Sequence, residues 1–452
     1  MLDLIDHGYG HERCLSEERE VDALKVVLTI PQYRVRRKAR DKWMAEVGVF
    51  ASDYDANLVV FPESFLSRYF GVGPLEDGQS VLKDLAKNYK TAVLAGFTTD
   101  KGYETALYCN PNPGPGETRE HVNFKHAISD RVAFQLPGWD NEVEEMFAPI
   151  DLRDQRIGVC VFFDMFLPAV VQAVENRGAS MFIDLTGDNV QPRMWQNVVG
   201  GRSLEAHAPF LCTMGYFATW PGTAISLAYD RGRAMEMTLA DGTTGYITSD
   251  APTYSLVTSP QDLLRPGLDK AYSPVASNDI TIALGTGRNA DIEITQGKEN
   301  IQVTSHGKGG ADCQNDWAYF NGSKNKLAML SLDINDLRNR AILLQKLPKD
   351  FDRNDPVQHL VLYSGAGTAG LSQQEIVALA SLRVIEHQVA ILILAGDIRE
   401  VLRQTQTQNV MRLAERNGLF GMKVQGMNNL TGPSFPEECA HFPEQYLRLL
   451  EK

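Results

Sequence analysis

Three positions in this chain combine a side chain that could do chemistry with the end of an apolar segment. Glu63 follows the run NLVVFP, Lys125 follows HVNF, and a tight turn at Asp164 follows the run Ile157–Phe163. A carboxylate at the end of a buried strand can act as a general base, and a nearby lysine can stabilise an oxyanion. Taken singly, an exposed or capping Glu63 and a solvated Lys125 are the more ordinary interpretations.

The turn at residues 162–164 is the least expected of the three. The segment IGVCVFFDMFLP is apolar without a break and rich in β-branched and aromatic residues, which predicts a strand covered on both faces. An α/β enzyme commonly places its nucleophile at such a strand end, but this turn offers only Phe162, Phe163 and Asp164. We expect Asp164 to bond the local backbone and these three residues to line any ligand pocket.

Two cysteines are candidates for a displaced nucleophile. Cys160 lies two residues before Phe162, on the same side of the predicted strand but about 6–7 Å further back. Cys212 lies in the apolar segment FLCTMG. Both positions are more typical of small core residues than of reactive thiols.

The elements that would position these residues alternate between strands and helices. That alternation predicts a layered α/β fold. The expected strands are Lys25–Ile30, Asn57–Phe61, Ala92–Phe97, Thr105–Cys109, Val122–Phe124, Ile157–Phe163, Met181–Leu185 and Pro209–Gly215, with helices near Arg37–Tyr54, Ser80–Tyr89, Ala169–Arg177 and Met194–His207, and a hairpin of Ile225–Tyr229 with Ala234–Thr238.

The rest of the chain predicts three further regions. Residues 1–23 form a polar, acidic N-terminal leader, and residues 246–324 are rich in Gly, Asn, Ser and Asp, which indicates an irregular β-rich insertion. Residues 348–452 form an α/β C-terminal extension with strands in HLVLYSG and AILILAG. A capping box at Ser372 and Glu375 begins one helix, and Ile398–Arg416 is a second expected helix. No internal repeat is visible in the sequence.

The composition of the chain bears on its partners, its location and its use of metals or cofactors. The chain has 452 residues, 43% hydrophobic and 22% charged, with a formal charge of −13, which disfavours nucleic acid and anionic membranes as partners. The N-terminus lacks a signal-peptide pattern, and no apolar run is long enough to span a bilayer. The 6 cysteines are scattered without a CxxC pair, so we expect reduced thiols in a cytoplasmic protein, with no metal and no cofactor.

Together the segments VVFPESF, NFKHA and RIGVCVFFDMFLP resemble, in order and rough spacing, the nitrilase or carbon–nitrogen hydrolase superfamily. Residues Arg202–His207 resemble the family's R-A-x-E-N helix, and the hairpin Ile225–Met237 resembles the strand pair that follows it. Leu327–Arg340 resembles its late strand and helix. The resemblance implies an αββα sandwich at residues 24–347, including the insertion, and a homodimer or higher oligomer, since members usually form eight-layered αββααββα dimers.

The same resemblance assigns roles. It implies Glu63 as general base and Lys125 as oxyanion stabiliser, and it places Phe162 where the family has its nucleophilic cysteine. A phenyl ring cannot form the thioester or thioimidate that this chemistry requires. A second glutamate expected soon after the lysine is also missing, since only Asp130 follows closely and Glu142, Glu144 and Glu145 come later.

Three functions stay open. The first is a degenerate family member that binds a small amide- or nitrile-like ligand or acts as a regulator or scaffold. The second is an active amidase-like hydrolase with a non-standard nucleophile, or with acid–base chemistry by Glu63 and Lys125. The third is an interaction protein whose function lies in residues 348–452, where Gly365-Ala366-Gly367 lacks the rest of a phosphate-binding fingerprint.

Overall fold

The computed structural model describes most of the chain in segments. They are residues 24–33, 35–126, 147–187, 192–215, 226–245, 253–257, 280–284, 291–296, 299–304, 318–321, 326–346, 357–387, 389–404, 410–412 and 419–422. The expected leader and the acidic residues Asp130, Glu142, Glu144 and Glu145 lie outside the described residues.

The first half of the chain builds two sheets. Eight of the described strands form the first sheet, in the order β13-β12-β14-β1-β2-β3-β4-β5. Its parallel centre is β1 (Val26–Ile30), β2 (Leu58–Val60) and β3 (Ala92–Thr98). The antiparallel strands are β4 (Glu104–Cys109), β5 (Glu120–Phe124), β12 (Met237–Leu239), β13 (Thr244–Gly245) and β14 (Thr253–Val257).

The second sheet has the order β11-β10-β9-β8-β7-β6. Its parallel centre carries the apolar segments that predicted it: β7 (Gln155–Val161), β8 (Met181–Thr186) and β9 (Pro209–Met214). Antiparallel edges are β6 (Ile150–Leu152), β10 (Ser226–Asp230) and β11 (Arg233–Ala234). The strand expected to reach Phe163 stops at Val161, because a 3-10 turn, η2 (Phe162–Phe166), begins there.

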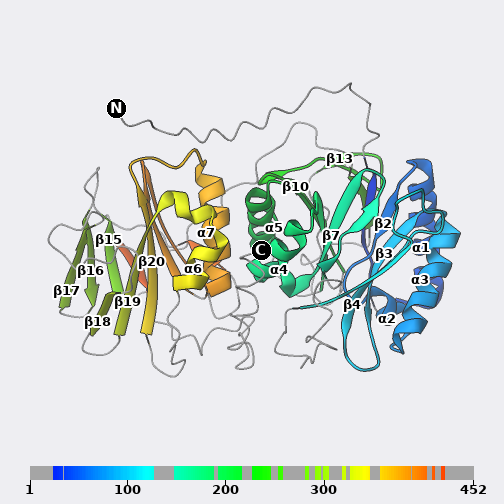
Figure 1. Ribbon diagram of the computed structural model, residues 1–452, viewed down its shortest axis with the longest axis horizontal. Coiled ribbons are helices and arrows are strands. Elements are labelled where there is room, and N and C mark those ends of the chain that lie inside the picture. Colours follow the sequence, from blue (N-terminus) through cyan, green and yellow to red (C-terminus); the bar gives the residue numbers. More distant parts are fainter. Residues whose placement is uncertain are drawn as a thin grey trace, which may run out of the picture.

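Helices cover the outer faces of these two sheets (Figure 1). The helices α1 (Arg37–Asp53), α2 (Phe65–Phe70) and α3 (Leu75–Tyr89) share a core with the first sheet, and α4 (Pro168–Asn176) and α5 (Pro192–Ala206) share one with the second. A third apolar cluster, with Val26, Leu58 and Ile157 among its members, lies between the sheets. This αββα arrangement confirms the α/β fold class.

The rest of the chain forms two more sheets. One has the order β18-β19-β20-β21-β22-β23, and the other is β17-β16-β15-β24. Their strands are β15 (Ile280–Leu284), β16 (Asp291–Gln296), β17 (Glu299–Thr304), β18 (Ala318–Asn321), β19 (Lys326–Asp333), β20 (Val357–Gly365), β21 (Ala390–Ala395), β22 (Ile398–Gln404), β23 (Val410–Arg412) and β24 (Leu419–Met422), with η3 (Ile334–Arg338), α6 (Arg340–Lys346) and α7 (Gln373–His387).

Along the long axis of Figure 1, α1 and α3 lie at one end and the strands β15, β16 and β17 at the other. Between them the order is sheet, sheet, α4 with α5, α7 with α6, and the sheet of β19 and β20. The boundary expected after residue 347 falls between α6 and β20, inside a single sheet, because β19 and β20 pair in parallel. The capping box at Ser372 is confirmed, since Ser372 N donates to Glu375 Oε2 and Glu375 N donates to Ser372 Oγ.

The helix expected at Ile398–Arg416 is wrong in its described residues. Ile398–Gln404 is the strand β22, which pairs antiparallel with the fully buried strand β21 through Ile391 and Leu402. The free backbone edge of β21 and the tight turn after Ala395 outweigh the helical propensity of this polar sequence, because tertiary context overrides propensity.

One close contact in the second sheet gives a test of this packing. A Cβ on Gly158 would lie 2.5 Å from Val174 Cγ1 and 2.8 Å from Phe182 Cδ1. Gly158→Ala should therefore lower the free energy of unfolding by about 1–3 kcal/mol through overpacking. Urea unfolding followed by circular dichroism measures it. Gly367→Ala, where the added methyl meets open space, is the matched control. Equal stability of the two variants would contradict the tight α4–β7 packing.

Candidate functional site

The structure brings together the residues that the sequence singled out. Glu63 follows β2, Lys125 follows β5 and Phe162 follows β7. Lys125 Nζ lies 2.7 Å from Glu63 Oε1, and it lies 5.1 Å from the centroid of the Phe162 ring and 5.4 Å from that of Phe163. The candidate site is thus a buried ion pair closed on one side by two aromatic rings.

The Glu63 turn is held by its backbone. Pro62 follows the strand β2, which ends at Val60, and Ser64 takes a left-handed conformation with φ of 57°. A Cβ on Gly96 would lie 2.5 Å from Glu63 Cα, so only glycine lets β3 approach this turn. Tyr33 donates a hydrogen bond of 3.3 Å to the Glu63 carbonyl. These contacts fix the position of the carboxylate before any ligand binds.

Lys125 is 4% exposed and Glu63 is 8% exposed. Burial by itself lowers the pKa of Lys125, but the Glu63 carboxylate outweighs burial, with support from Glu104 and Asp164, and the net pKa is raised. The amine therefore stays protonated through the ordinary pH range. A fixed cation in a dry site could stabilise an anionic ligand atom or a developing oxyanion.

The Phe162 turn has unusual backbone geometry. Phe162 has φ of 49°, which is a genuine outlier for a bulky side chain and costs of order 1–3 kcal/mol. Asp164 supports the turn, because its carboxylate accepts hydrogen bonds from Val161 N at 3.0 Å and from His126 N at 2.8 Å. The expected local backbone bond of Asp164 is therefore present, and its second bond ties the turn to the residue after Lys125.

The three residues expected to line a pocket differ in their surroundings. Asp164 is fully buried and Phe163 nearly so, whereas Phe162 is partly exposed. The Phe162 ring stacks on Phe163 with centroids 4.0 Å apart and lies 5.5 Å from Trp195. Phe162 is thus the aromatic surface of the site, and Asp164 anchors the turn beneath it.

Gly187 is a site residue that the sequence did not reveal. A Cβ on Gly187 would lie 2.3 Å from Glu63 Oε2 and 3.5 Å from Phe162 Cδ1. Its backbone therefore forms a wall of the site, where any larger residue would displace the carboxylate. The glycine directly after the strand β8 was the available signal, since glycine often marks close backbone approach.

A second missed feature is a buried polar cluster at Trp195, whose ring lies 5.5 Å from that of Phe162. Asp184 lies between Cys160 and Cys212 in the register of the second sheet. Its carboxyl group accepts hydrogen bonds from Thr186 and Cys212, and Trp195 Nε1 donates to Thr186 Oγ1 at 2.9 Å. Burial raises the pKa of Asp184 to about 8. The group is therefore largely neutral at pH 7, and an aspartate inside the apolar strand MFIDLT was its signal.

Neither cysteine is placed for nucleophilic attack. Cys160 and Cys212 are fully buried, and burial raises the pKa of each thiol well above its usual value. A nucleophilic cysteine needs a thiolate and access to substrate, and both thiols here lack the surroundings that would supply them.

Other features in the described part of the chain give weaker evidence of a functional site. Within the described ranges, no group of three or more His, Cys, Asp and Glu residues could hold a metal ion. His126 is buried and stacks on Phe147 with centroids 4.5 Å apart, which makes it a packing residue. Among the helices described, none is both long and apolar enough to cross a membrane.

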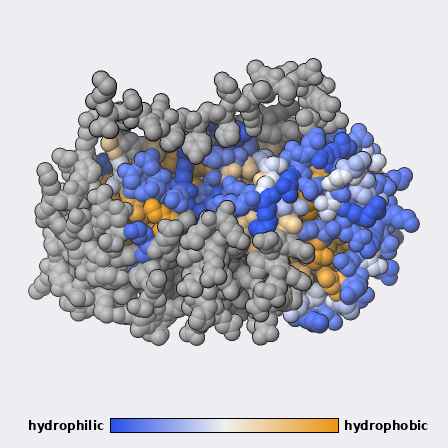
Figure 2. Space-filling view, viewed as in Figure 1, coloured by the Kyte–Doolittle hydropathy of each residue, from blue (hydrophilic) through white to orange (hydrophobic). Residues whose placement is uncertain are grey.

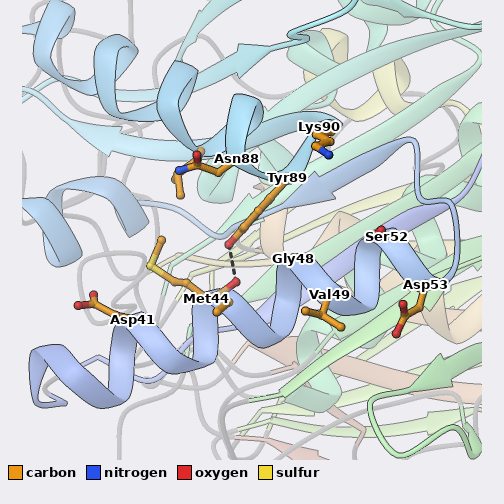
Figure 3. A pocket seen from close by; sticks show the side chains of 11 residues that line it. Asp41, Met44, Gly48, Val49, Ser52, Asp53, Asn88, Tyr89 and Lys90 are labelled. Atoms are coloured by element: carbon orange, nitrogen blue, oxygen red, sulfur yellow. Dashed lines mark hydrogen bonds between the residues drawn. The ribbon is translucent and has the colours of Figure 1, made fainter.

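A surface groove of about 610 Å³ lies between helices of the outer layer (Figure 3). Its walls are α1 and α3, and Tyr89 donates a 2.8 Å hydrogen bond to the Met44 carbonyl across it. Figure 2 shows a mainly hydrophilic surface at this end of the molecule. The groove contains none of the residues around Glu63, so it is no part of the candidate site.

Comparison with known proteins adds a family match. Residues 24–218 match the family model for carbon-nitrogen hydrolase. Similar solved structures include an amidase from Nesterenkonia sp., with 16% identity, a TM-score of 0.42, and coverage of 54% of this chain and 92% of that chain. A mutant of the amidase from Nesterenkonia sp. AN1 in complex with butyramide has 16% identity, a TM-score of 0.41, and coverage of 53% and 92%. None of the curated proteins matches.

The buried ion pair predicts a large effect of removing one partner. Glu63→Gln leaves the Lys125 ammonium buried without its 2.7 Å partner and should lower the free energy of unfolding by about 3–5 kcal/mol. Adding Lys125→Met should recover part of that loss. Urea unfolding measures both variants. Glu46→Gln, at an exposed pair on α1, is the control and should change little. A loss no greater than that of the control would contradict the buried pair.

Asp184 predicts a pH dependence of stability. Between an ordinary pKa near 3.8 and the folded pKa of about 8, the folded chain keeps a proton that the unfolded chain has lost. The stability from this group is therefore full below about pH 4 and is lost as the pH rises toward 8. Asp184→Asn should gain stability relative to wild type by roughly 1.4 kcal/mol per pH unit in that window.

Urea unfolding at several pH values between 5 and 8 measures this difference. The exposed Asp53 gives a matched control, since Asp53→Asn should leave the slope of stability against pH unchanged. Parallel curves for wild type and Asp184→Asn would show that Asp184 ionises normally in the folded chain.

Proposed function

Residues 24–218 belong to the carbon–nitrogen hydrolase (nitrilase) superfamily, and from that premise we propose that this chain is a degenerate member that binds a small amide- or nitrile-like ligand without breaking its C–N bond. The observation that carries the proposal is Phe162. It occupies the left-handed turn at the end of β7, and its ring lies 5.1 Å from Lys125 Nζ. The family's covalent route needs a thiolate there, and a phenyl ring offers none.

The remaining groups suit binding. A protonated Lys125 can donate to a carbonyl or nitrile acceptor, and the Glu63 carboxylate can accept from an amide N–H. Phe162 supplies an apolar face beside them. Two polar groups that converge on a partly exposed aromatic ring are a common arrangement for orienting a small polar ligand. A regulatory or scaffold role would use the same binding to bias contacts made by the second half of the chain.

An active hydrolase is the second candidate, favoured by the intact Glu63–Lys125 pair. It would use Glu63 to activate water and Lys125 to stabilise the oxyanion, with no covalent intermediate. The burial of Cys160 and Cys212 argues against a displaced thiol nucleophile. Release of ammonia by the wild-type protein separates this candidate from the first.

Two expectations accompany the proposal. The scattered cysteines support a cytoplasmic location, which stays a prediction. A homodimer also stays a prediction, and the mass of the intact chain in solution measures it.

The test of the function is ammonia release from a panel of amides, nitriles and ureas, with ligand-observed NMR of the same panel. We expect wild type to bind at least one panel member and to release no ammonia. Phe162→Cys should restore release, because it returns a thiol to a turn that Asp164 still holds. Phe163→Cys, one residue along, is the matched control and should stay silent.

Three outcomes would overturn the proposal. Wild-type release that is lost in Cys160→Ala would identify a rearranged thiol hydrolase. Wild-type release that survives Cys160→Ala and is lost in Glu63→Gln would identify the acid–base route. Absence of binding by every panel member would remove the ligand class.

A further inference from the structure

The four sheets divide cleanly along the chain. Every described strand of the first two sheets lies between Val26 and Val257, and every described strand of the last two lies between Ile280 and Met422. No described sheet mixes strands from both stretches. We call residues 26–257 the first half and residues 280–422 the second half.

One sheet of each half has the same topology. In both, an edge strand pairs antiparallel with the next, three strands run parallel, and two antiparallel strands complete the sheet. The connections agree as well. In chain order, β6, β7, η2, α4, β8, α5, β9, β10 and β11 correspond to β18, β19, η3, α6, β20, α7, β21, β22 and β23.

The correspondence extends to length and register. Both α5 and α7 have 15 residues, both β9 and β21 have 6, and both η2 and η3 have 5. If η2 is aligned with η3 and α5 with α7, the row Cys160–Asp184–Cys212 falls on the row Leu332–Tyr363–Ile393. A shared order and shared directions over six strands, with a shared register over the central three, indicate duplication of one unit.

The two halves meet through the equivalent helices α5 and α7, and their contact is reciprocal. Arg202 and Glu205 of α5 correspond to Arg383 and Glu386 of α7 in this alignment. Arg202 Nη2 lies 2.5 Å from Glu386 Oε1, and Arg383 Nη2 contacts Glu205 Oε1. Within each helix the arginine also binds its own glutamate, at 2.7 Å and 2.6 Å. All four side chains are fully buried.

Apolar contacts repeat the same reciprocity. Leu204 of α5 belongs to the core of the second half, while its counterpart Ile385 of α7 belongs to the core of the first half. A Cβ on Gly201 would lie 2.6 Å from Leu382 Cδ1, so the helices approach closely there. Contacts that are made twice, with the roles of the two sides exchanged, define an isologous interface, the kind that joins two identical subunits about a twofold axis.

The alignment also shows what the second half has lost. Ile334 stands where the first half has Phe162, and Tyr363 and Ile393 replace Asp184 and Cys212. The polar cluster is therefore absent from the second half at these positions. Two features are common to both halves. Asp336 stands in the position of Asp164. In each half an arginine Nε also donates a hydrogen bond to the 3-10 turn, from Arg202 to Met165 O and from Arg383 to Leu337 O.

We propose that residues 318–412 are a second, degenerate copy of residues 150–234, and that they occupy the face of α5 on which another copy of this chain would dock. The chain is its own partner at this interface. Glu386 holds Arg202, and Arg202 Nε holds Met165 O in the turn that carries Phe162. The second copy therefore braces the candidate site of the first. Any dimer of the whole chain uses a face other than α5.

The experiment cuts the chain after it has folded. A recognition sequence for a specific protease is inserted between Val257 and Ile280 of the full-length protein, and the purified protein is then cleaved at that site. The two fragments should stay together as one particle with the same mass as the uncut protein, which is 50.2 kDa per chain, in size-exclusion chromatography with light scattering. Dilution then gives the dissociation constant of the fragments without any mutation.

Variants at the interface make the test specific. Glu386→Gln should weaken association of the fragments by about 100-fold or more. Two buried guanidinium groups, Arg202 and Arg383, would then share the single carboxylate of Glu205. Leu204→Ala should weaken it as well, through the core of the second half, and serves if Glu386→Gln does not fold. Glu46→Gln, on α1 at the far end, is the control and should not change association.

Three results would contradict the proposal. Separation or aggregation of the wild-type fragments on cleavage would overturn the proposal. So would interface variants that dissociate no more readily than Glu46→Gln. A particle that holds two N-terminal fragments and no C-terminal fragment would show that α5 binds its own copy in preference to α7.

Discussion

Four buried charges hold the two halves of this molecule together. Arg202, Glu205, Arg383 and Glu386 form a closed ring in which each guanidinium binds one carboxylate on its own helix and one on the other. Burial alone would raise the pKa of Glu205, yet the two arginines lower it to about 2. The ring is neutral only when complete, so no side chain in it can be removed without leaving a charge in the interior.

The same ring reaches the candidate site through one hydrogen bond. Arg202 Nε donates to the Met165 carbonyl in η2 at 2.8 Å, and Asp164 in that turn binds the backbone of Val161 and His126. Hydrogen bonds to Asp164 and from Arg202 thus both hold the turn in which Phe162 takes its left-handed conformation. A strained turn of this kind does not depend on the identity of the side chain at its first position, because backbone contacts maintain it.

The sequence predicted those parts of the fold that depend on local pattern. Apolar strands, the order of the first two sheets' main elements and the meeting of Glu63, Lys125 and Phe162 could be inferred from motifs and alternation. Asp184 and Gly187 were missed because their importance comes from neighbours far along the chain. The strand β22 was mistaken for a helix, since its sequence is polar and only the open edge of β21 makes it extended.

The duplication could not be seen in the sequence for a related reason. Strand register is maintained by backbone hydrogen bonds and by the two faces of a sheet, so Cys160, Asp184 and Cys212 could become Leu332, Tyr363 and Ile393 without a change of topology. Side chains that contact the other half were under a stricter requirement, because each must fit a partner. The R-x-x-E pattern of α5 and α7 survives where that requirement applies.

The order of the two halves has a consequence for synthesis on the ribosome. Leu204 and the charged pair of α5 leave the ribosome long before Leu382 and its neighbours, by roughly 10 to 35 s at about 5–20 residues per second. During that interval a folded first half would expose the apolar side chain of Leu204 and an incomplete charge ring to solvent. In that interval, two nascent chains can pair wrongly through their α5 helices. The interval ends when α7, which belongs to the same chain, packs against α5.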